Sequence, residues 1–310
     1  LASEHAGRIA SIQTVGGCGA LRLGGELLKV ARPDAVLHVS DPTWANHEPL
    51  LGSAGVRLDR YPYYDPATRG VDFERMIDHL DGLAGGDVVL LHACCHNPTG
   101  VDPSPEQWGE IADTCSRRGL LPFVDLAYQG FGDDLETDVA GLRRLAQSVP
   151  ELLLAVSCSK NFGLYRDRVG ALTFVAKDPE TAKAVDSQAL FVVRTMYSLP
   201  PDHGAAVVAH ILNDDALRAE WLDELAAMRA RLKGMRKLLV EELAKAAPDR
   251  DFSHIERTTG MFCYLGISAE QVARLKKERG VYMVVSSRIN VCGITERNVR
   301  YLAESIASVL

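Results

Sequence analysis

Residues 156–170, VSCSKNFGLYRDRVG, place Lys160 among small hydroxyl residues, with two arginines six and eight positions later. A lysine at the end of a buried strand has a lowered pKa, which makes its amine nucleophilic toward a carbonyl carbon. Ser157 and Arg168 could hold a phosphate beside it, because a guanidinium presents a planar fork of donors. The usual alternative is a solvated surface lysine, so the segment must be interpreted together with the rest of the chain.

Three other segments carry glycine or polar residues where a parallel sheet binds its ligands, at strand ends and helix starts. Gly17 and Cys18 lie at the start of GGCGALRLGGELL, where free backbone N–H groups favour an anion such as phosphate. HNPTG follows an apolar run and supplies Asn97 in a proline-defined turn. In FVDLAYQGF, Asp125 ends a very apolar run and Tyr128 follows three residues later. A carboxylate buried there needs a cationic or N–H partner.

Together these residues match the needs of pyridoxal phosphate. Asp125 would keep the pyridine nitrogen protonated, so that the ring accepts electrons from the substrate carbon. Tyr128 and Asn97 would donate to the ring oxygen, and the glycine-rich start with Ser157 would hold the phosphate. Lys160 would hold the aldehyde as a Schiff base and, once displaced by substrate, act as the proton-transfer base.

The sequence HACCH briefly resembles a metal site. On an extended strand, His92, Cys94 and His96 would point to one face. However, no second ligand pair such as C-x-x-C follows elsewhere, and neighbouring cysteines are usually small buried hydrophobes. We therefore expect no metal.

Composition limits the class of protein. The 310 residues suffice for one large or two medium domains. A charge of −7 argues against a nucleic-acid or anionic-membrane binder, and no apolar run approaches the ~20 residues that cross a bilayer. The start, LASEHAGRIA, has no signal-peptide pattern and no Met, which suggests a processed or incomplete product. Seven irregularly spaced cysteines favour a reducing cytoplasm.

The order of the elements predicts an α/β fold. Short apolar runs such as DVVLLHACC and ELLLAVSCS alternate with helical patterns such as SPEQWGEIADTCSRRG, which indicates a mostly parallel sheet covered on both faces. ELLLAVSCS and VGALTFVA are too close for a helical crossover, so they should pair antiparallel. Residues 214–247 predict one long helix. We expect a large domain over residues 1–226 and a small C-terminal α+β domain over residues 227–310, entered through that helix.

The sequence strongly resembles the class I pyridoxal-phosphate aminotransferases, in particular the aspartate and aromatic amino acid aminotransferases. The segments that carry the resemblance follow the family's order from about Gln13 to Leu310: GGCGAL, DPTWANH, HACCHNPTGVDP, FVDLAYQGF, SCSKNFGLYRDRVG, YSLPPDHG, GMFCYLG and SSRINVCG. The resemblance implies the three-layer fold-type I architecture of these transferases and a homodimer with shared active sites.

The resemblance also implies a role for each matching residue. Lys160 corresponds to the Schiff-base lysine, Asp125 to the partner of the pyridine nitrogen, and Tyr128 and Asn97 to the donors to the ring oxygen. The other cofactor contacts are Trp44, stacked on the ring, and the phosphate cup of Gly17, Cys18, Ser157 and Arg168.

The remaining matches concern the substrate and the surroundings of the site. Arg288 corresponds to the arginine that grips the α-carboxylate as a bidentate pair, with Trp44 and Asn97 beside it. Arg194 corresponds to the arginine that reaches from the partner subunit toward a side-chain carboxylate. His47 and His92 resemble histidines that stand behind the Asp, although a core histidine is an alternative for either.

Three departures from the family affect these expectations. Cys18 stands where Thr or Ser usually contacts the phosphate, and a thiol is a weak donor. Leu199 replaces Asn or Ser, which makes the pocket less polar and could favour aromatic substrates. The family's N-terminal portion, with its dimer arm and a tyrosine given to the neighbour's phosphate, is expected to be absent.

The expected reaction transfers an amino group between aspartate, or an aromatic amino acid, and 2-oxoglutarate. A β-lyase or decarboxylase on the same fold is one alternative, and an incomplete, non-catalytic relative is another. Two arginines placed for a dicarboxylic substrate favour transfer, because the 2-oxo acid must also be seated.

Overall fold

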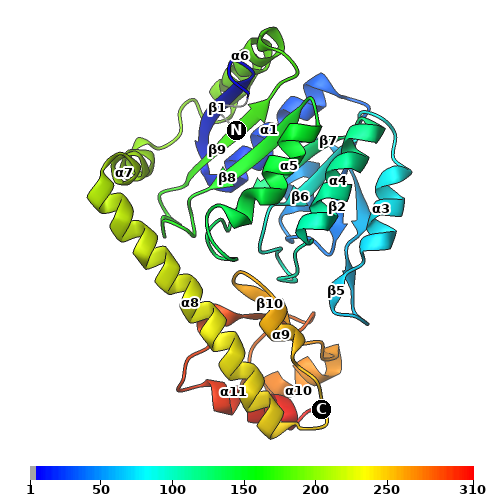
Figure 1. Cartoon of the computed structure of the whole chain (residues 1–310), viewed down its shortest axis with the longest axis vertical. Helices are drawn as coiled ribbons and strands as arrows, with labels where there is room; N and C mark the ends of the chain where they lie inside the picture. Colours follow the sequence, from blue (N-terminus) through cyan, green and yellow to red (C-terminus); the bar gives the residue numbers. More distant parts are fainter. Residues whose placement is uncertain (1–4) are drawn as a thin grey trace.

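Seven strands form the main sheet in a computed structural model, which describes residues 5–310. Their spatial order is β1-β9-β8-β7-β6-β2-β3 (Figure 1). The strands are β1 (Ile9–Val15), β2 (Val36–Asp41), β3 (Arg57–Pro62), β6 (Val88–His92), β7 (Leu121–Leu126), β8 (Leu152–Ser157) and β9 (Val169–Val175). All neighbouring pairs from β3 to β8 are parallel, whereas β9 runs antiparallel to both β8 and β1. The mostly parallel sheet and its antiparallel β8–β9 pair are therefore confirmed.

The strand β1 was not expected from the sequence. Its segment, IASIQTV, has two fully buried side chains, Ile12 and Thr14, among polar and partly exposed ones. It pairs along its whole length with β9, from Ile9 opposite Val175 to Val15 opposite Val169. A strand at the edge of a sheet is supported by such pairing rather than by a continuous apolar run.

Helices cover both faces of the sheet. They are α1 (Gly16–Ala31), α2 (His47–Gly52), α3 (Phe73–Asp81), α4 (Pro105–Arg118), the 3₁₀ turn η1 (Thr137–Val139), α5 (Ala140–Ser148) and α6 (Pro179–Met196). Successive side chains of β7 point to opposite faces: Phe123 packs in the core that contains Leu23 of α1, and Val124 packs in the core that contains Ile111 of α4. The result is the three-layer arrangement that the sequence predicted.

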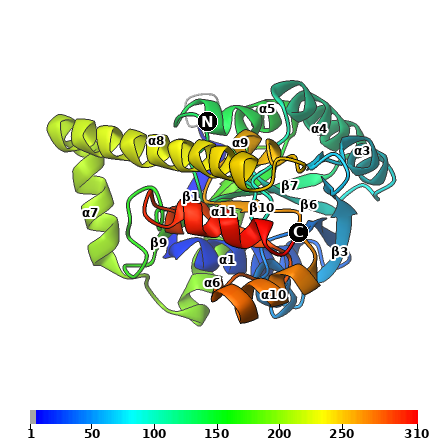
Figure 2. The same cartoon turned by 90° about the horizontal axis from the view of Figure 1, so that it is seen from below.

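One long helix connects the sheet to the C-terminal elements. After α7 (Asp202–Asn213), α8 (Asp215–Ala246) runs from the sheet to the far end of the molecule (Figures 1 and 2). Its start is capped by Asp214, whose carboxylate accepts hydrogen bonds from the N–H groups of Ala216 and Leu217. This matches the helix expected over residues 214–247. The expected domain boundary after residue 226 falls inside α8 and stays a prediction.

The C-terminal elements form a small α+β layer beside the lower half of α8 (Figure 1). They are α9 (His254–Arg257), β10 (Phe262–Tyr264), α10 (Ala269–Arg279), β11 (Arg288–Asn290), η2 (Val291–Gly293) and α11 (Val299–Ala307), and a separate small hairpin near the sheet joins β4 (Tyr64–Asp65) to β5 (Gly70–Val71). β10 and β11 pair antiparallel, with Tyr264 opposite Arg288. None of the helices within residues 5–310 is long and apolar enough to span a membrane.

The contact between α1 and β7 gives a test of the packing. A Cβ atom added to Gly24 would run into the buried ring of Phe123, whereas a Cβ atom on Gly109 of α4 would meet no atom within 4 Å. Gly24→Ala should therefore lower the free energy of unfolding by about 1–3 kcal/mol. The matched control Gly109→Ala should raise it by about 0.5–1 kcal/mol through helix propensity. Urea unfolding followed by circular dichroism measures both, and a Gly24→Ala protein as stable as wild type would contradict this packing.

Candidate active site

The predicted site residues meet where three strands end and one helix begins. β6 ends at His92, Asp125 is the penultimate residue of β7, β8 ends at Ser157, and α1 starts next to them after β1. One cavity at this edge is lined by most of the residues singled out in the sequence: Gly17, Cys18, Trp44, His92, Asn97, Asp125, Tyr128, Ser157, Lys160 and Arg168. The carboxyl edge of a mostly parallel sheet is the place where such folds bind ligands.

Asp125 presents a buried carboxylate to this cavity, with an exposed fraction of 7%. Its Oδ2 lies 3.1 Å from His47 Nε2, while Oδ1 has no hydrogen-bond partner among residues 5–310. Burial opposes ionisation, but the hydrogen bond with His47 and the nearby Lys160 outweigh it and lower the pKa of Asp125 below its usual value. The carboxylate is therefore charged at neutral pH, with one oxygen left for a ligand.

A row of polar side chains stands behind Asp125. Thr43 Oγ1 lies 2.7 Å from His47 Nδ1 and 3.3 Å from His92 Nε2. Burial, aided by the nearby His47, lowers the pKa of His92 to about 3, so His92 is neutral at pH 7. Thr43 was missed in the sequence although it belongs to the segment DPTWANH, because a single threonine carries no signal of its own.

Lys160 lies just beyond the end of β8, and its Nζ is 4.5 Å from the centroid of the Tyr128 ring. Burial lowers the pKa of its amine, Arg168 adds to this, and Asp125 and Cys18 oppose it. The Tyr128 hydroxyl accepts a hydrogen bond of 3.4 Å from Asn97 Nδ2, and burial raises the pKa of this phenol, which stays protonated. The cavity thus holds a partly desolvated amine beside a neutral hydroxyl donor.

The start of α1 and Arg168 form a compact cradle for an anion. No side chain caps the N-terminus of α1. The Gly16 N–H donates to the Arg168 carbonyl at 2.9 Å, and the N–H groups that follow in the first turn are left for an anion. Gly16 has a φ of +65°, and a Cβ atom there would lie 2.5 Å from Arg168 Nη2, so only glycine fits. Arg168 Nη1 donates to the Tyr165 carbonyl at 2.8 Å, and Nη2 has no hydrogen-bond partner within residues 5–310.

Four further residues line the cavity that the sequence did not single out: the apolar Leu21 and Ala127, and the polar Ser159 and Tyr165. Ser159 donates its N–H to Ser157 Oγ at 3.2 Å, and Tyr165 lies on the loop that follows Lys160. Both belong to the segment that contains Lys160. Their participation depends on how the loop folds back on the cavity, which residue types alone do not indicate.

The two arginines that the sequence predicted to bind substrate occupy different places. Arg288, at the start of β11, donates from Nη1 to Asn97 Oδ1 at 3.1 Å and stacks 4.5 Å from the centroid of the Phe262 ring. Arg194 is exposed near the end of α6, donates to Ser198 Oγ at 2.9 Å and does not line the cavity. An action of Arg194 on substrate therefore requires a second subunit, as the sequence suggested, and stays a prediction.

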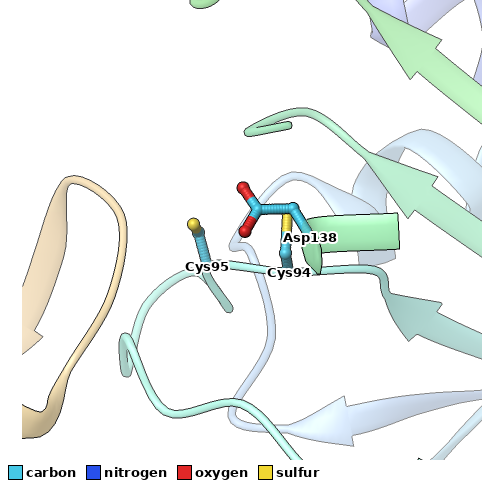
Figure 3. A group of neighbouring side chains, drawn as sticks. All are labelled: Cys94, Cys95 and Asp138. Carbon is cyan, nitrogen blue, oxygen red and sulfur yellow. The ribbon is translucent and has the colours of Figure 1, made fainter. Parts of the chain in front are cut away.

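The segment HACCH brings the rings of His92 and His96 together, with centroids 4.2 Å apart, but Cys94 groups with other residues and not with these histidines. β6 ends at His92 and the chain then bends, so the alternation of a strand no longer applies. Among residues 5–310, the one group with metal-ligand spacing is Cys94, Cys95 and Asp138, whose ligand atoms lie within 4.8 Å of one another (Figure 3).

This group already has internal partners. The Asp138 carboxylate accepts hydrogen bonds from the backbone N–H groups of Gly130, Gly132 and Asp133. The contact with Cys95, together with burial, raises the pKa of the Cys94 thiol, and burial raises that of Cys95. A metal would have to deprotonate both thiols and compete with three amide donors, so we keep the prediction of no metal.

The neutral state of His92 predicts a pH dependence of stability. The unfolded chain protonates this histidine below its ordinary pKa of 6.5, whereas the folded chain does so only near 3. The unfolded state therefore binds the extra proton as the pH falls, and stability is lost between pH 6.5 and 3. In His92→Gln, the free energy of unfolding should fall less steeply over this window, by about 1 kcal/mol per pH unit. Urea titrations from pH 8 to 5 measure the slopes, which should coincide above pH 7.5; equal slopes below pH 6.5 would contradict the neutral assignment.

Comparison with known proteins agrees with this geometry. The family model "Aminotransferase class I and II" matches residues 3–306. The aspartate aminotransferase of Haemophilus influenzae is 48% identical over 303 residues, which cover 98% of this chain and 76% of that protein. The aromatic-amino-acid aminotransferase of Pseudomonas aeruginosa is 48% identical over 302 residues, covering 97% and 75%.

Solved structures give the same result. The aromatic-amino-acid aminotransferase of Burkholderia pseudomallei, solved covalently bound to pyridoxal phosphate, has a TM-score of 0.96 and 45% identity, and the match covers 98% of this chain and 76% of that one. The mitochondrial aspartate aminotransferase of Trypanosoma brucei has a TM-score of 0.97 and 44% identity, with 100% and 82% covered. The chain thus spans about three quarters of most of these relatives. It belongs to the class I and II aminotransferases.

Proposed function

We propose that this protein is a pyridoxal-phosphate-dependent aminotransferase that moves an amino group between aspartate, or an aromatic amino acid, and 2-oxoglutarate. One observation carries the proposal: the Lys160 amine, the Asp125 carboxylate and the uncapped start of α1 line a single cavity. The relatives described above bear the names of these activities.

The donors and acceptors in the cavity fit the cofactor at three points. Asp125 Oδ1 is a charged acceptor without a protein partner, which suits a protonated ring nitrogen. Arg168 Nη2 and the N–H groups at the start of α1 suit a phosphate, in a cradle that a Cβ atom on Gly16 would fill. The Lys160 amine, whose pKa burial lowers, suits an aldehyde carbon.

The residues of the chain then have distinct tasks. When bound, pyridoxal phosphate supplies an electron sink for the carbon that loses its proton. Lys160 Nζ takes up and returns this proton, because its lowered pKa favours the free amine. Asp125 holds a proton on the ring nitrogen, and Asn97 with Tyr128 orients the ring oxygen by hydrogen bonding. Trp44 covers the ring, while Gly17, Cys18, Ser157 and Arg168 hold the phosphate.

The substrate is held by its carboxylates. Arg288 grips the α-carboxylate, and its guanidinium is already oriented by Asn97 and Phe262. Arg194 of a partner subunit meets a side-chain carboxylate, as in aspartate or 2-oxoglutarate. The apolar Leu199 five residues later, with an exposed fraction of 78%, supports acceptance of aromatic side chains as well.

A homodimer is part of the proposal. On α6, large apolar side chains one turn before Arg194 are exposed, at Leu190 with 53% and Phe191 with 66%. A patch of this kind on a monomer marks an interaction surface. A self-complementary contact across it would bring Arg194 toward the neighbour's cavity.

We also propose a reducing, cytoplasmic location. Its support is that all seven cysteines are free thiols, and cell fractionation with an antibody against the chain would check it.

The first test concerns Lys160. Lys160→Ala should lower kcat with aspartate and 2-oxoglutarate by about 10⁴-fold or more, because both the covalent contact and the proton transfer are lost. Coupled detection of oxaloacetate and glutamate measures the rate, and Lys177→Ala, at an exposed lysine, is the matched control. If Lys160→Ala turns over within ten-fold of the wild-type rate, the assignment of Lys160 as the catalytic lysine is wrong. Release of ammonia or carbon dioxide in place of glutamate would indicate a lyase or decarboxylase.

A second test concerns Arg194 and the dimer. Arg194→Leu should lower kcat/KM for aspartate by about 100-fold and leave that for phenylalanine within about three-fold, since of these two amino acids only aspartate has a side-chain carboxylate that loses its charge partner. If Arg194 acts across the interface, mixing Arg194→Leu with Lys160→Ala subunits rebuilds one native site per heterodimer. Aspartate activity should then return to about a quarter of wild type, as random pairing in a two-fold dimer gives. No recovery despite subunit exchange, which light scattering and mass spectrometry can verify, would place Arg194 elsewhere.

A further inference from the structure

Asp102 accepts three hydrogen bonds that tie separate parts of the chain together. Its Oδ2 accepts from the Cys95 N–H at 2.7 Å and from the Thr259 hydroxyl at 2.6 Å, and its Oδ1 accepts from the His96 N–H at 2.8 Å. Thr259 lies 157 residues farther along the chain. Oδ2 therefore joins the loop after β6 to the segment before β10, while Oδ1 holds the loop itself.

These two segments also touch backbone to backbone. The Thr259 N–H donates to the Gly100 carbonyl at 2.7 Å. A Cβ atom on Gly100 would run into the Phe262 carbonyl, and one on Gly260 would run into Cys95. Both glycines have positive φ, +71° and +72°. The two segments thus pack so closely that a side chain at either Gly100 or Gly260 would break the contact.

A buried cation holds the same segment from its other side. Arg236 of α8, with an exposed fraction of 2%, donates from Nε to Thr258 Oγ1 at 3.0 Å and from Nη2 to the Gly260 carbonyl at 2.6 Å. No carboxylate among residues 5–310 forms an ion pair with it. The charge of Asp102 is among those that oppose the lowering of its pKa by burial. Thr259 therefore lies between a guanidinium from α8 and the Asp102 carboxylate.

The joined segments lead directly to two residues of the proposed site. Asn97 follows His96 in the loop that Asp102 fixes. On the other side, residues 258–261 lead into β10, which pairs with β11, the strand that begins with Arg288. Arg288 Nη1 in turn donates to Asn97 Oδ1 at 3.1 Å. The contacts thus form a closed ring from Asp102 through Asn97, Arg288 and Thr259 back to Asp102. Within this ring, Asp102 is the carboxylate that connects the loop after β6 to the segment before β10.

We propose that Asp102 is a positioning residue: by accepting from Cys95, His96 and Thr259, it fixes Asn97 relative to Arg288 and so sets the grip on the α-carboxylate. This inference rests on the proposed function. The α-carboxylate is common to the amino acid and the 2-oxo acid, so Asp102 acts equally on both substrates and on every side chain they carry. An asparagine cannot replace it, because its NH₂ group would face a backbone N–H or the Thr259 hydroxyl.

The test compares substrate binding with turnover in Asp102→Asn. KM for aspartate, phenylalanine and 2-oxoglutarate should each rise about ten-fold, as loss of hydrogen bonds to a charged acceptor loosens the grip. We expect kcat to fall by less than about three-fold, because the groups that move the proton are untouched. The ratio of kcat/KM between aspartate and phenylalanine should stay unchanged.

A matched pair at Thr259 checks this ring of contacts without altering the carboxylate. Thr259→Val removes the hydroxyl at constant shape and should raise the same KM values by about three-fold. Thr259→Ser keeps the donor and should restore them. Asp134→Asn is the control for a lost carboxylate, because Asp134 accepts from Glu136, the Thr137 N–H and the Thr137 hydroxyl in an exposed turn. It should leave every KM unchanged.

Hydrogen exchange on the cofactor-free chain supplies a readout independent of activity. In Asp102→Asn, the amides of Cys95, His96 and Thr259 should all exchange faster, whereas in Asp134→Asn they should not. If Asp102→Asn lowers the melting temperature and kcat but leaves KM unchanged, Asp102 has only a structural role, and the proposal is overturned. A Thr259→Val protein with unchanged KM would overturn it too. If the wild-type chain does not transaminate, the proposed function fails. The link between Asp102 and Thr259 is tested separately: if the Thr259 amide exchanges at the same rate in Asp102→Asn as in wild type, that link is refuted as well.

Discussion

A charged carboxylate buried at the end of β7 is the constraint on which the rest of the site depends. Asp125 is 7% exposed, and an ionised carboxylate without partners at such a place costs several kcal/mol. His47 meets one oxygen, and Thr43 holds His47 against His92. The polar row behind the strand thus keeps the charge in place and leaves the other oxygen for a ligand in the cavity.

The cradle for an anion follows from the close packing of backbone rather than from a dedicated motif. The pairing of β1 with β9 brings Gly16 next to Gly170. A Cβ atom added to Gly170 would lie 2.5 Å from the Gly16 carbonyl carbon. This contact aims the first turn of α1 at the same cavity that Arg168 borders. An edge strand that carries no chemistry of its own therefore determines where the N–H groups of this turn lie.

The site is built from both ends of the chain. The sheet supplies the amine, the carboxylate and the cradle, whereas Arg288 comes from the small C-terminal layer that α8 carries (Figure 1). A site divided in this way needs a fixed distance between its parts. Three independent contacts join the loop after β6 and α8 to the segment before β10. They are the hydrogen bonds of Asp102, the close packing of Gly100 against Phe262, and the hydrogen bonds of the buried Arg236. Such contacts combine into a rigid unit when each polar group is satisfied.

The sequence by itself determined the fold class, the long helix, the antiparallel pair and most of the residues that line the cavity. These follow from patterns carried by neighbouring residues, such as apolar runs and the segments around Lys160 and Asp125. It did not find β1, whose half-exposed segment is defined by pairing with β9, nor Thr43, Ser159 and Tyr165.

Only the tertiary structure decided that Cys94 turns away from His92 toward Asp138, that Arg194 stays outside the cavity of its own chain, and that Asp102 meets Thr259. Each of these depends on where segments far apart in the chain are placed, or on a bend after a strand. The types of the residues leave such placements open, because the same aspartate, cysteine or arginine is equally compatible with a solvated turn, a buried cluster or a subunit interface.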